Sequence, residues 1–299
     1  MMNFGRVITA MVTPFDVNGE INYEKTERLI NYLLQNGTDA LVVAGTTGES
    51  PTLSKEEKLS LFKFVVKTVK HRVPVIAGTG SNNTRESIEL TKKAETIGGV
   101  DAILLVAPYY NKPSQEGLFQ HFSVIAETTT LPVMIYNIPG RTSVNIEPST
   151  IIDLANIDNI VSVKEASGNL DAMTTIIRET DSSFSLYCGD DSLTLPSVAI
   201  GAKGIVSVSS HIIGNEMNEM IAACQHGNYH RAQELHHYLL PIMQSLFMAP
   251  SPTPPVKAAL AMTGIDVGNV RLPLVPLNEH EMALLQHELH FIQKNYNAC

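Results

Sequence analysis

The chain has 299 residues, of which 44% are hydrophobic and 17% charged, so it can bury a full core and does not have the composition of a disordered protein. The formal net charge is −9, and no run of Lys or Arg could neutralise consecutive phosphates, which excludes nucleic acid and anionic membranes as partners. No apolar stretch reaches the roughly 18 residues of a membrane span, and the N-terminal one is too short and interrupted for a secretory signal.

Eight short apolar runs rich in Val and Ile alternate along the chain with segments of helical periodicity. The helical segments include NYEKTERLINYLLQNG at 22–37 and TRESIELTKKAETIGG at 84–99, where apolar residues recur at three and four. Runs of this kind are typical of strands that are buried on both faces, and their alternation with helices predicts a parallel sheet. The eight runs lie at 7–14, 40–49, 73–80, 102–111, 132–139, 160–167, 185–191 and 204–210.

Eight strand–helix units are the number that closes a (β/α)8 TIM barrel, which we place at residues 1–227. An open, doubly wound sheet is disfavoured because no GxGxxG motif follows the first strand. The strand signal stops after about residue 212, and residues 228–299 are expected to form a C-terminal helical region. The PSPTPP stretch at 250–255 indicates a bend between two packed helices in this region.

Cysteine and histidine patterns do not predict a metal site. The three cysteines, Cys188, Cys224 and Cys299, are odd in number and lack CxxC spacing, so neither a disulfide framework nor a thiolate zinc site is indicated. His226 and His230 have i, i+4 spacing, but the chain has no HExxH motif. We expect a cytoplasmic protein without a metal or another cofactor.

Lys164 is the main candidate for chemistry. In a barrel the active site lies at the carboxyl ends of the strands, and Lys164 is near the end of the apolar run IVSVKEAS. Burial there would lower its pKa and produce a neutral amine that can attack a ketone. A lysine whose head reaches a carboxylate such as Glu165 explains the pattern equally well.

Hydroxyl groups lie at the ends of other runs. Tyr136 lies near the end of the run before that of Lys164, and Thr46 lies near the end of the second run. Side chains of these types can pass protons along hydrogen bonds. Each residue also has an ordinary structural explanation. The segment GTTGES at 45–50 lacks the lysine and the spacing of a P-loop, so its N–H groups suit a small carboxylate better than a phosphate. It leads into a helix whose start, SKEE at 54–57, has capping-box spacing.

Taken together, eight motifs resemble the signature of the dihydrodipicolinate synthase family, whose members are pyruvate-dependent Schiff-base aldolases. The motifs are GTTGES, GTGSNNT, APYYNKPSQEGLFQHF, YNIPGRT, VKEASGN, GDD, GIVSV and RLPLVPL, in this order over nearly the whole chain. The resemblance implies condensation of pyruvate with L-aspartate 4-semialdehyde to 4-hydroxy-tetrahydrodipicolinate, in lysine and diaminopimelate biosynthesis. It also implies a homotetramer built as a dimer of dimers.

The resemblance assigns a role to each matching residue. Lys164 would form the imine, and Tyr136, Thr46 and Tyr110 would relay protons, with Tyr110 contributed across a subunit interface. Four further positions correspond to substrate contacts: Thr47 for the pyruvate carboxylate, Val206 and Gly189 near the imine, and Arg141 for the carboxylate of the semialdehyde.

Three other functions remain open at this point. N-acetylneuraminate lyase shares the barrel and the lysine, but such lyases resemble YNIPxLSG where this chain has Arg141, and an apolar residue there cannot clamp a carboxylate. A catalytically idle barrel and a metal-dependent aldolase are the other two.

One departure from the family concerns regulation. Members that lysine inhibits typically carry His in the helix after GTTGES, where this chain has Lys55 and Lys58, although Ser50, Asn82, Glu86 and Tyr109 match the effector site. Because like charges repel, we expect L-lysine to inhibit weakly or not at all.

Overall fold

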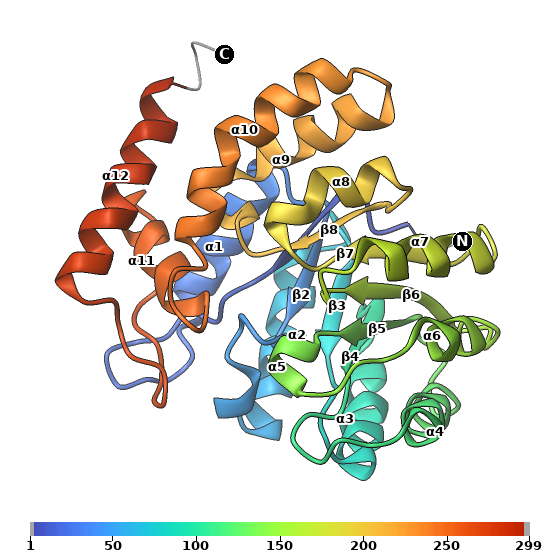
Figure 1. Cartoon of the computed structure of the whole chain (residues 1–299). Helices are drawn as coiled ribbons and strands as arrows, with labels where there is room; N and C mark the ends of the chain where they lie inside the picture. Colours follow the sequence, from blue (N-terminus) through green and yellow to red (C-terminus); the bar gives the residue numbers. More distant parts are fainter. Residues whose placement is uncertain (1–2, 296–299) are drawn as a thin grey trace.

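The computed structural model describes residues 3–295, and it contains a closed barrel of eight parallel strands in chain order (Figure 1). Each predicted run contains one strand, so the expected (β/α)8 fold is confirmed. The strands are β1 Val7–Ala10, β2 Ala40–Val43, β3 Val75–Gly78, β4 Ala102–Val106, β5 Val133–Asn137, β6 Ile160–Glu165, β7 Ser185–Cys188 and β8 Gly204–Ser207.

Helices surround the barrel, and several begin where the sequence indicates. The Asn22 side chain accepts a hydrogen bond from the N–H of Lys25 at the start of the first helix, and Ser54 and Glu57 form the predicted capping box. The helices that follow the strands are α1 Tyr23–Gln35, α2 Lys55–Val69, α3 Thr84–Thr96, α4 Gln115–Ala126, α5 Pro139–Thr142, α6 Pro148–Leu154, α7 Leu170–Glu179, α8 Thr194–Ala199 and α9 Ser210–Gln225, with short 3-10 turns η1 Ser50–Thr52 and η2 Asp191–Leu193.

The C-terminal helices gather on one side of the barrel (Figure 1). They are α10 Tyr229–Ser245, α11 Thr253–Met262 and α12 Glu279–Asn295. The predicted bend separates α10 from α11, whose first turn contains Pro254 and Pro255, where the missing N–H of proline costs no helical hydrogen bond. The division at residue 227 falls between α9 and α10, and the independence of the two parts stays a prediction.

Two apolar cores position the site. A large core lies between the strands and the helices, and a smaller one fills the interior of the barrel with residues such as Phe4, Ile8, Met134 and Tyr187. Because the interior is packed, a substrate can enter only at the mouth, where the strands end. Within the described chain, every helix falls short of the length or the hydrophobicity needed to cross a bilayer.

Candidate active site

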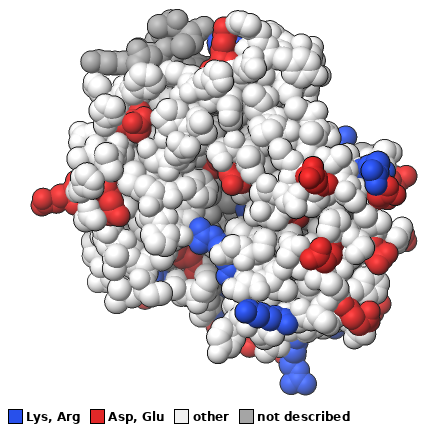
Figure 2. Space-filling model, viewed as in Figure 1, with Lys and Arg blue, Asp and Glu red and all other residues white. Residues whose placement is uncertain are grey.

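A cavity of about 580 Å³ opens at the carboxyl ends of β2 to β5, next to β6; Lys164 itself is not among its lining residues. Thr46, Tyr136 and Arg141 line it together with residues from α2 and α3. The face of the molecule in Figure 2 is hollowed near its centre, and side chains of both charges surround the hollow. A polar cavity of this size can hold two small charged substrates.

Lys164 lies on β6 inside the barrel, and its residue is 6% exposed. Burial lowers its pKa to about 8, helped by the charge of Arg141 and opposed by that of Asp191. At neutral pH about a tenth of such a lysine is free amine, far more than for an exposed lysine. A useful fraction of the side chain is therefore in the free-amine form that a nucleophile requires.

The alternative for Lys164, a lysine whose head reaches Glu165, does not occur. The Glu165 carboxylate instead accepts hydrogen bonds from the Asn137 side chain (2.9 Å) and the Ser167 N–H (2.7 Å). Among the residues described, Lys164 forms no ion pair within 4.0 Å. Its nitrogen lies instead 4.1 Å from the centroid of the Tyr136 ring.

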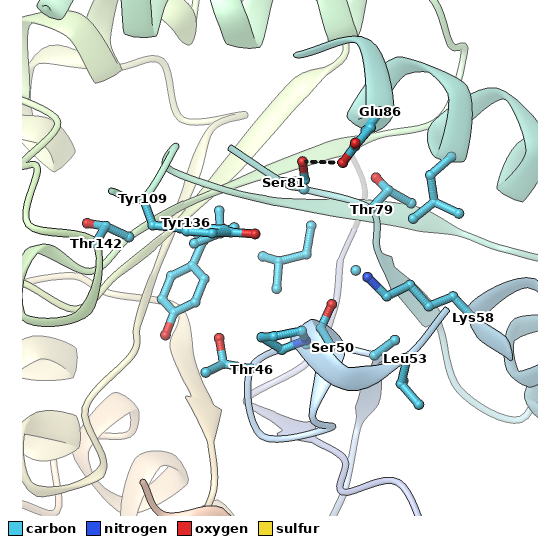
Figure 3. Close-up of a pocket in the computed structure, with 18 of the residues that line it drawn as sticks. Thr46, Ser50, Leu53, Lys58, Thr79, Ser81, Glu86, Tyr109, Tyr136 and Thr142 are labelled. Carbon is cyan, nitrogen blue, oxygen red and sulfur yellow. Dashed lines mark hydrogen bonds between the residues drawn. The ribbon is translucent and has the colours of Figure 1, made fainter. Parts of the chain in front are cut away.

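Tyr136 and Thr46 form a pair of hydroxyls beside the amine. Tyr136 is the register partner of Lys164 on the neighbouring strand, and its hydroxyl points toward the Thr46 side chain (Figure 3). Burial raises the pKa of Tyr136 to about 12, against the effects of Arg141 and Thr46, so the phenol keeps its proton at neutral pH. The arrangement can donate a proton and receive one back.

The turn at residues 45–49, here called the carboxylate turn, presents unused N–H groups. The Glu49 N–H donates to the Thr46 carbonyl (3.1 Å), which closes the turn. The N–H groups of Thr47 and Gly48, both buried, donate to no acceptor in the described part of the chain. Adjacent free N–H groups of this kind can bind a small anion such as a carboxylate.

Gly189 and Val206 complete the surroundings of the lysine. A Cβ atom on Gly189 would lie 2.7 Å from the Cβ of Ala166 and 3.0 Å from the Cε of Lys164, so glycine leaves room for the lysine stem. Val206 is 1% exposed on β8 and belongs to the interior core. Both predicted residues therefore lie within the barrel or at its mouth.

The structure does not bring Tyr110 to the cavity of its own chain. Tyr110 follows β4 in a left-handed conformation (φ 76°), and the residue is 88% exposed. It is absent from the cavity lining, whereas its neighbour Tyr109 is part of it. The role implied for Tyr110 at a subunit interface stays a prediction.

Asp191 is a site residue that the sequence reasoning passed over. It is 1% exposed in η2, and one carboxylate oxygen accepts the N–H groups of Val208 (3.1 Å) and Ser209 (2.8 Å), while its charge raises the pKa of Lys164. The GDD motif, with a carboxylate directly after a buried strand, was the available signal. No group of three metal-binding side chains occurs within the described residues.

Comparison with known proteins identifies the family. The model of the dihydrodipicolinate synthetase family matches residues 3–291. A 4-hydroxy-tetrahydrodipicolinate synthase of Bacillus velezensis is 61% identical over 280 residues, which cover 94% of this chain and 96% of the relative.

Solved structures agree with the sequence comparison. The dihydrodipicolinate synthase of Bacillus anthracis has a TM-score of 0.95 at 61% identity and covers 97% of this chain and 99% of its own. An enzyme from Cyanidioschyzon merolae, solved with lysine bound, has a TM-score of 0.95 at 46% identity, covering 97% and 98%. The chloride-inhibited enzyme of Acinetobacter baumannii, solved with pyruvate, has a TM-score of 0.94 at 39% identity, covering 97% and 99%. The chain therefore belongs to the dihydrodipicolinate synthetase family.

Proposed function

We propose that this protein is a 4-hydroxy-tetrahydrodipicolinate synthase of lysine biosynthesis, and that it condenses pyruvate with L-aspartate 4-semialdehyde through an imine on Lys164. The enzyme class is that of the relatives at about 60% identity. The observation that carries the mechanism is a buried lysine without a carboxylate partner, with a pKa of about 8, beside two hydroxyls at a barrel mouth.

The first half-reaction joins pyruvate to the lysine. The free amine of Lys164 attacks the C2 carbonyl carbon, and the carbinolamine oxygen leaves as water after taking a proton from the Tyr136 hydroxyl. The Thr46 side chain lowers the pKa of the phenol and so favours this transfer. The Tyr136 phenolate then takes a proton from the C3 methyl group, which restores the phenol and converts the protonated imine into an enamine, whose C3 is a carbon nucleophile.

The carboxylate of pyruvate binds at the carboxylate turn. The N–H groups of Thr47 and Gly48 are free to donate to it. Adjacent N–H groups of this kind bind a small anion. Gly189 keeps the space next to the lysine stem open, and Val206 lies on β8, two strands along the barrel from β6, where its backbone would contact the imine. The relative from Acinetobacter baumannii was solved in complex with pyruvate.

The second half-reaction uses Arg141 at the cavity wall. Its guanidinium can form two parallel hydrogen bonds with the carboxylate of aspartate semialdehyde and so orient the aldehyde towards the enamine. C3 of the enamine attacks the aldehyde carbon, and the new alkoxide takes up a proton. The arginine and the names of the relatives favour this substrate over the N-acetylmannosamine that a sialic-acid lyase would use.

The exposed Tyr110 supports a site that is shared between two copies. A tyrosine that is 88% exposed and held in a left-handed turn does not line the cavity of its own chain. A second copy that supplied Tyr110 would complete the proton relay, so we propose a homo-oligomer, with the homotetramer implied by the family as its form.

We place the enzyme in the cytoplasm, where reduced cysteines are stable. Cys188 and Cys224 are free, and Cys299 lies outside the described residues.

The experiment that tests the function is covalent trapping. Pyruvate and borohydride should reduce the imine to a stable adduct, and digestion should place the added mass on the peptide that contains Lys164. The Lys164→Ala variant is the matched control and should give no adduct. An unlabelled wild-type protein, or an adduct on another lysine, would refute the mechanism.

A further inference from the structure

The carboxylate turn is tied to the C-terminal helical region by two buried contacts from α11. The Thr253 hydroxyl donates to the Thr47 carbonyl (3.2 Å). One helical turn later, Lys257 forms an ion pair with Glu49, with 2.7 Å between its nitrogen and the carboxylate oxygen. Residues at i and i+4 lie on one face of a helix, so a single face of α11 holds the turn at two places.

The ion pair is embedded in further contacts. The side chains of Lys257 and Glu49 are 4% and 0% exposed. The second oxygen of Glu49 accepts the N–H of Arg271 (2.8 Å), and Lys257 also donates to the carbonyl of Asn269 (2.9 Å). The ammonium group lies 4.3 Å from the centroid of the Phe15 ring. The helix α11 and the backbone at Arg271 therefore meet at the carboxylate of Glu49, which lies far from both in sequence.

Glu49 needs this support because its backbone is left-handed, with φ 58° and ψ 35°. Non-glycine residues adopt that conformation at an energetic cost, and it persists where the surroundings enforce it. Glu49 immediately follows Gly48, whose N–H is one of the two free donors. A relaxation of Glu49 would therefore displace these donors.

We propose that Lys257 is a positioning residue for pyruvate: acting through Glu49, it holds the carboxylate turn in the conformation that presents the N–H groups of Thr47 and Gly48. This inference rests on the function proposed above. A buried ion pair contributes little net stability compared with apolar residues of the same size, but it can specify one conformation. Here the conformation that it specifies belongs to the anion-binding turn.

The test compares two ketones that differ in the group the turn binds. Trapping with borohydride is measured against the concentration of pyruvate and of acetone, which lacks the carboxylate. In the Lys257→Met variant, half-maximal trapping should require roughly 10- to 100-fold more pyruvate, because small displacements of a binding group are costly. Trapping with acetone should stay within about twofold of the wild type, since it needs only Lys164.

A matched control removes another ion pair between the barrel and the C-terminal region. Lys25 pairs with Asp266 at 2.6 Å and contacts no part of the carboxylate turn. Lys25→Met should leave both trapping curves unchanged. A second variant, Thr253→Val, keeps the ion pair and should raise the pyruvate requirement by a smaller factor.

Each outcome separates the two proposals. A wild-type protein that traps neither ketone refutes the imine mechanism itself. If the wild type traps normally, two results with Lys257→Met refute the positioning role alone. One is an unchanged dependence on pyruvate concentration, and the other is an equal loss of trapping with pyruvate and with acetone. If Lys257→Met does not fold, two further variants decide: Thr253→Val and the double variant Glu49→Gln/Lys257→Met, which removes both charges. A pyruvate dependence that is unchanged in both variants overturns the proposal.

Discussion

The side-chain nitrogen of Lys164 lies 4.1 Å from the ring centroid of Tyr136, its register partner on the adjacent strand. The aromatic ring covers one side of the amine, while the hydroxyl of the same residue points toward Thr46 (Figure 3). One residue thus contributes both to the low-dielectric surroundings that lower the pKa of the lysine and to the supply of protons.

The rate of imine formation should depend on pH with a midpoint near the lysine's pKa of about 8. Below this value the amine holds a proton and cannot attack, and above it the free amine predominates, so the rate rises with pH. Initial rates of trapping with pyruvate over a pH series measure the midpoint. A midpoint near 10.5, the ordinary value, would contradict the assigned burial effect.

The same series tests Asp191. Its negative charge raises the pKa of Lys164, so Asp191→Asn should move the midpoint to lower pH while an amide oxygen can still accept the N–H groups of Val208 and Ser209. An unchanged midpoint would show that the charge does not act on the amine.

Replacing Tyr136 by Phe should lower kcat by roughly 10²- to 10⁴-fold, the usual contribution of a proton-transfer group. The ring remains, so the stability of the barrel should change little. Thr46→Val should also reduce kcat, and the double variant should lose little more, because the two hydroxyls act as a unit. Steady-state kinetics on the three variants measure this; additive losses would argue against a relay.

Arg141→Ala should leave the final yield of pyruvate trapping intact, although its rate near neutral pH should fall because the charge of Arg141 helps to lower the pKa of Lys164, and it should depress turnover with aspartate semialdehyde. The reason is that Arg141 lies on α5 at the cavity wall and would contact only the second substrate. Loss of a charged hydrogen-bonding partner should cost about 2–5 kcal/mol in kcat/KM. Loss of trapping in this variant would mean that Arg141 binds pyruvate instead.

Gly189→Ala should impair imine formation, because the added Cβ would lie 3.0 Å from the Cε of Lys164 and 2.7 Å from the Cβ of Ala166. Overpacking of this kind typically costs about 1–3 kcal/mol of stability. Gly140→Ala is the control, since nothing lies within 4 Å of a Cβ at that position. Trapping yield and thermal unfolding distinguish displacement of the lysine from general destabilisation.

L-Lysine at millimolar concentration should inhibit weakly or not at all. Lys58 projects its nitrogen into the cavity (Figure 3), and Lys55, although paired with Glu89 at 2.6 Å, lines the same cavity. Two cations at this place repel a cationic effector. The relative from Cyanidioschyzon merolae was solved with lysine bound, so it is a suitable positive control for lysine binding. Strong inhibition of this enzyme would refute the prediction.

Local patterns in the sequence were enough for the barrel and for the placement of Lys164, because strands buried on both faces have a recognisable composition. The same patterns allowed two interpretations of Lys164, as a nucleophile or as a lysine that is paired with Glu165. That choice depends on which face of β6 each side chain occupies, and the tertiary structure directs Glu165 to Asn137 and Ser167.

Contacts over long sequence distances were decided by the tertiary structure alone. Lys257 lies in a mostly buried, largely apolar helix, and nothing near it in the sequence indicates that its partner is Glu49, 208 positions earlier. The exposure of Tyr110 likewise follows from a left-handed turn that its neighbours do not announce. Local periodicity determines which face of an element is apolar, but only packing of the whole chain determines which polar groups meet when that face is buried.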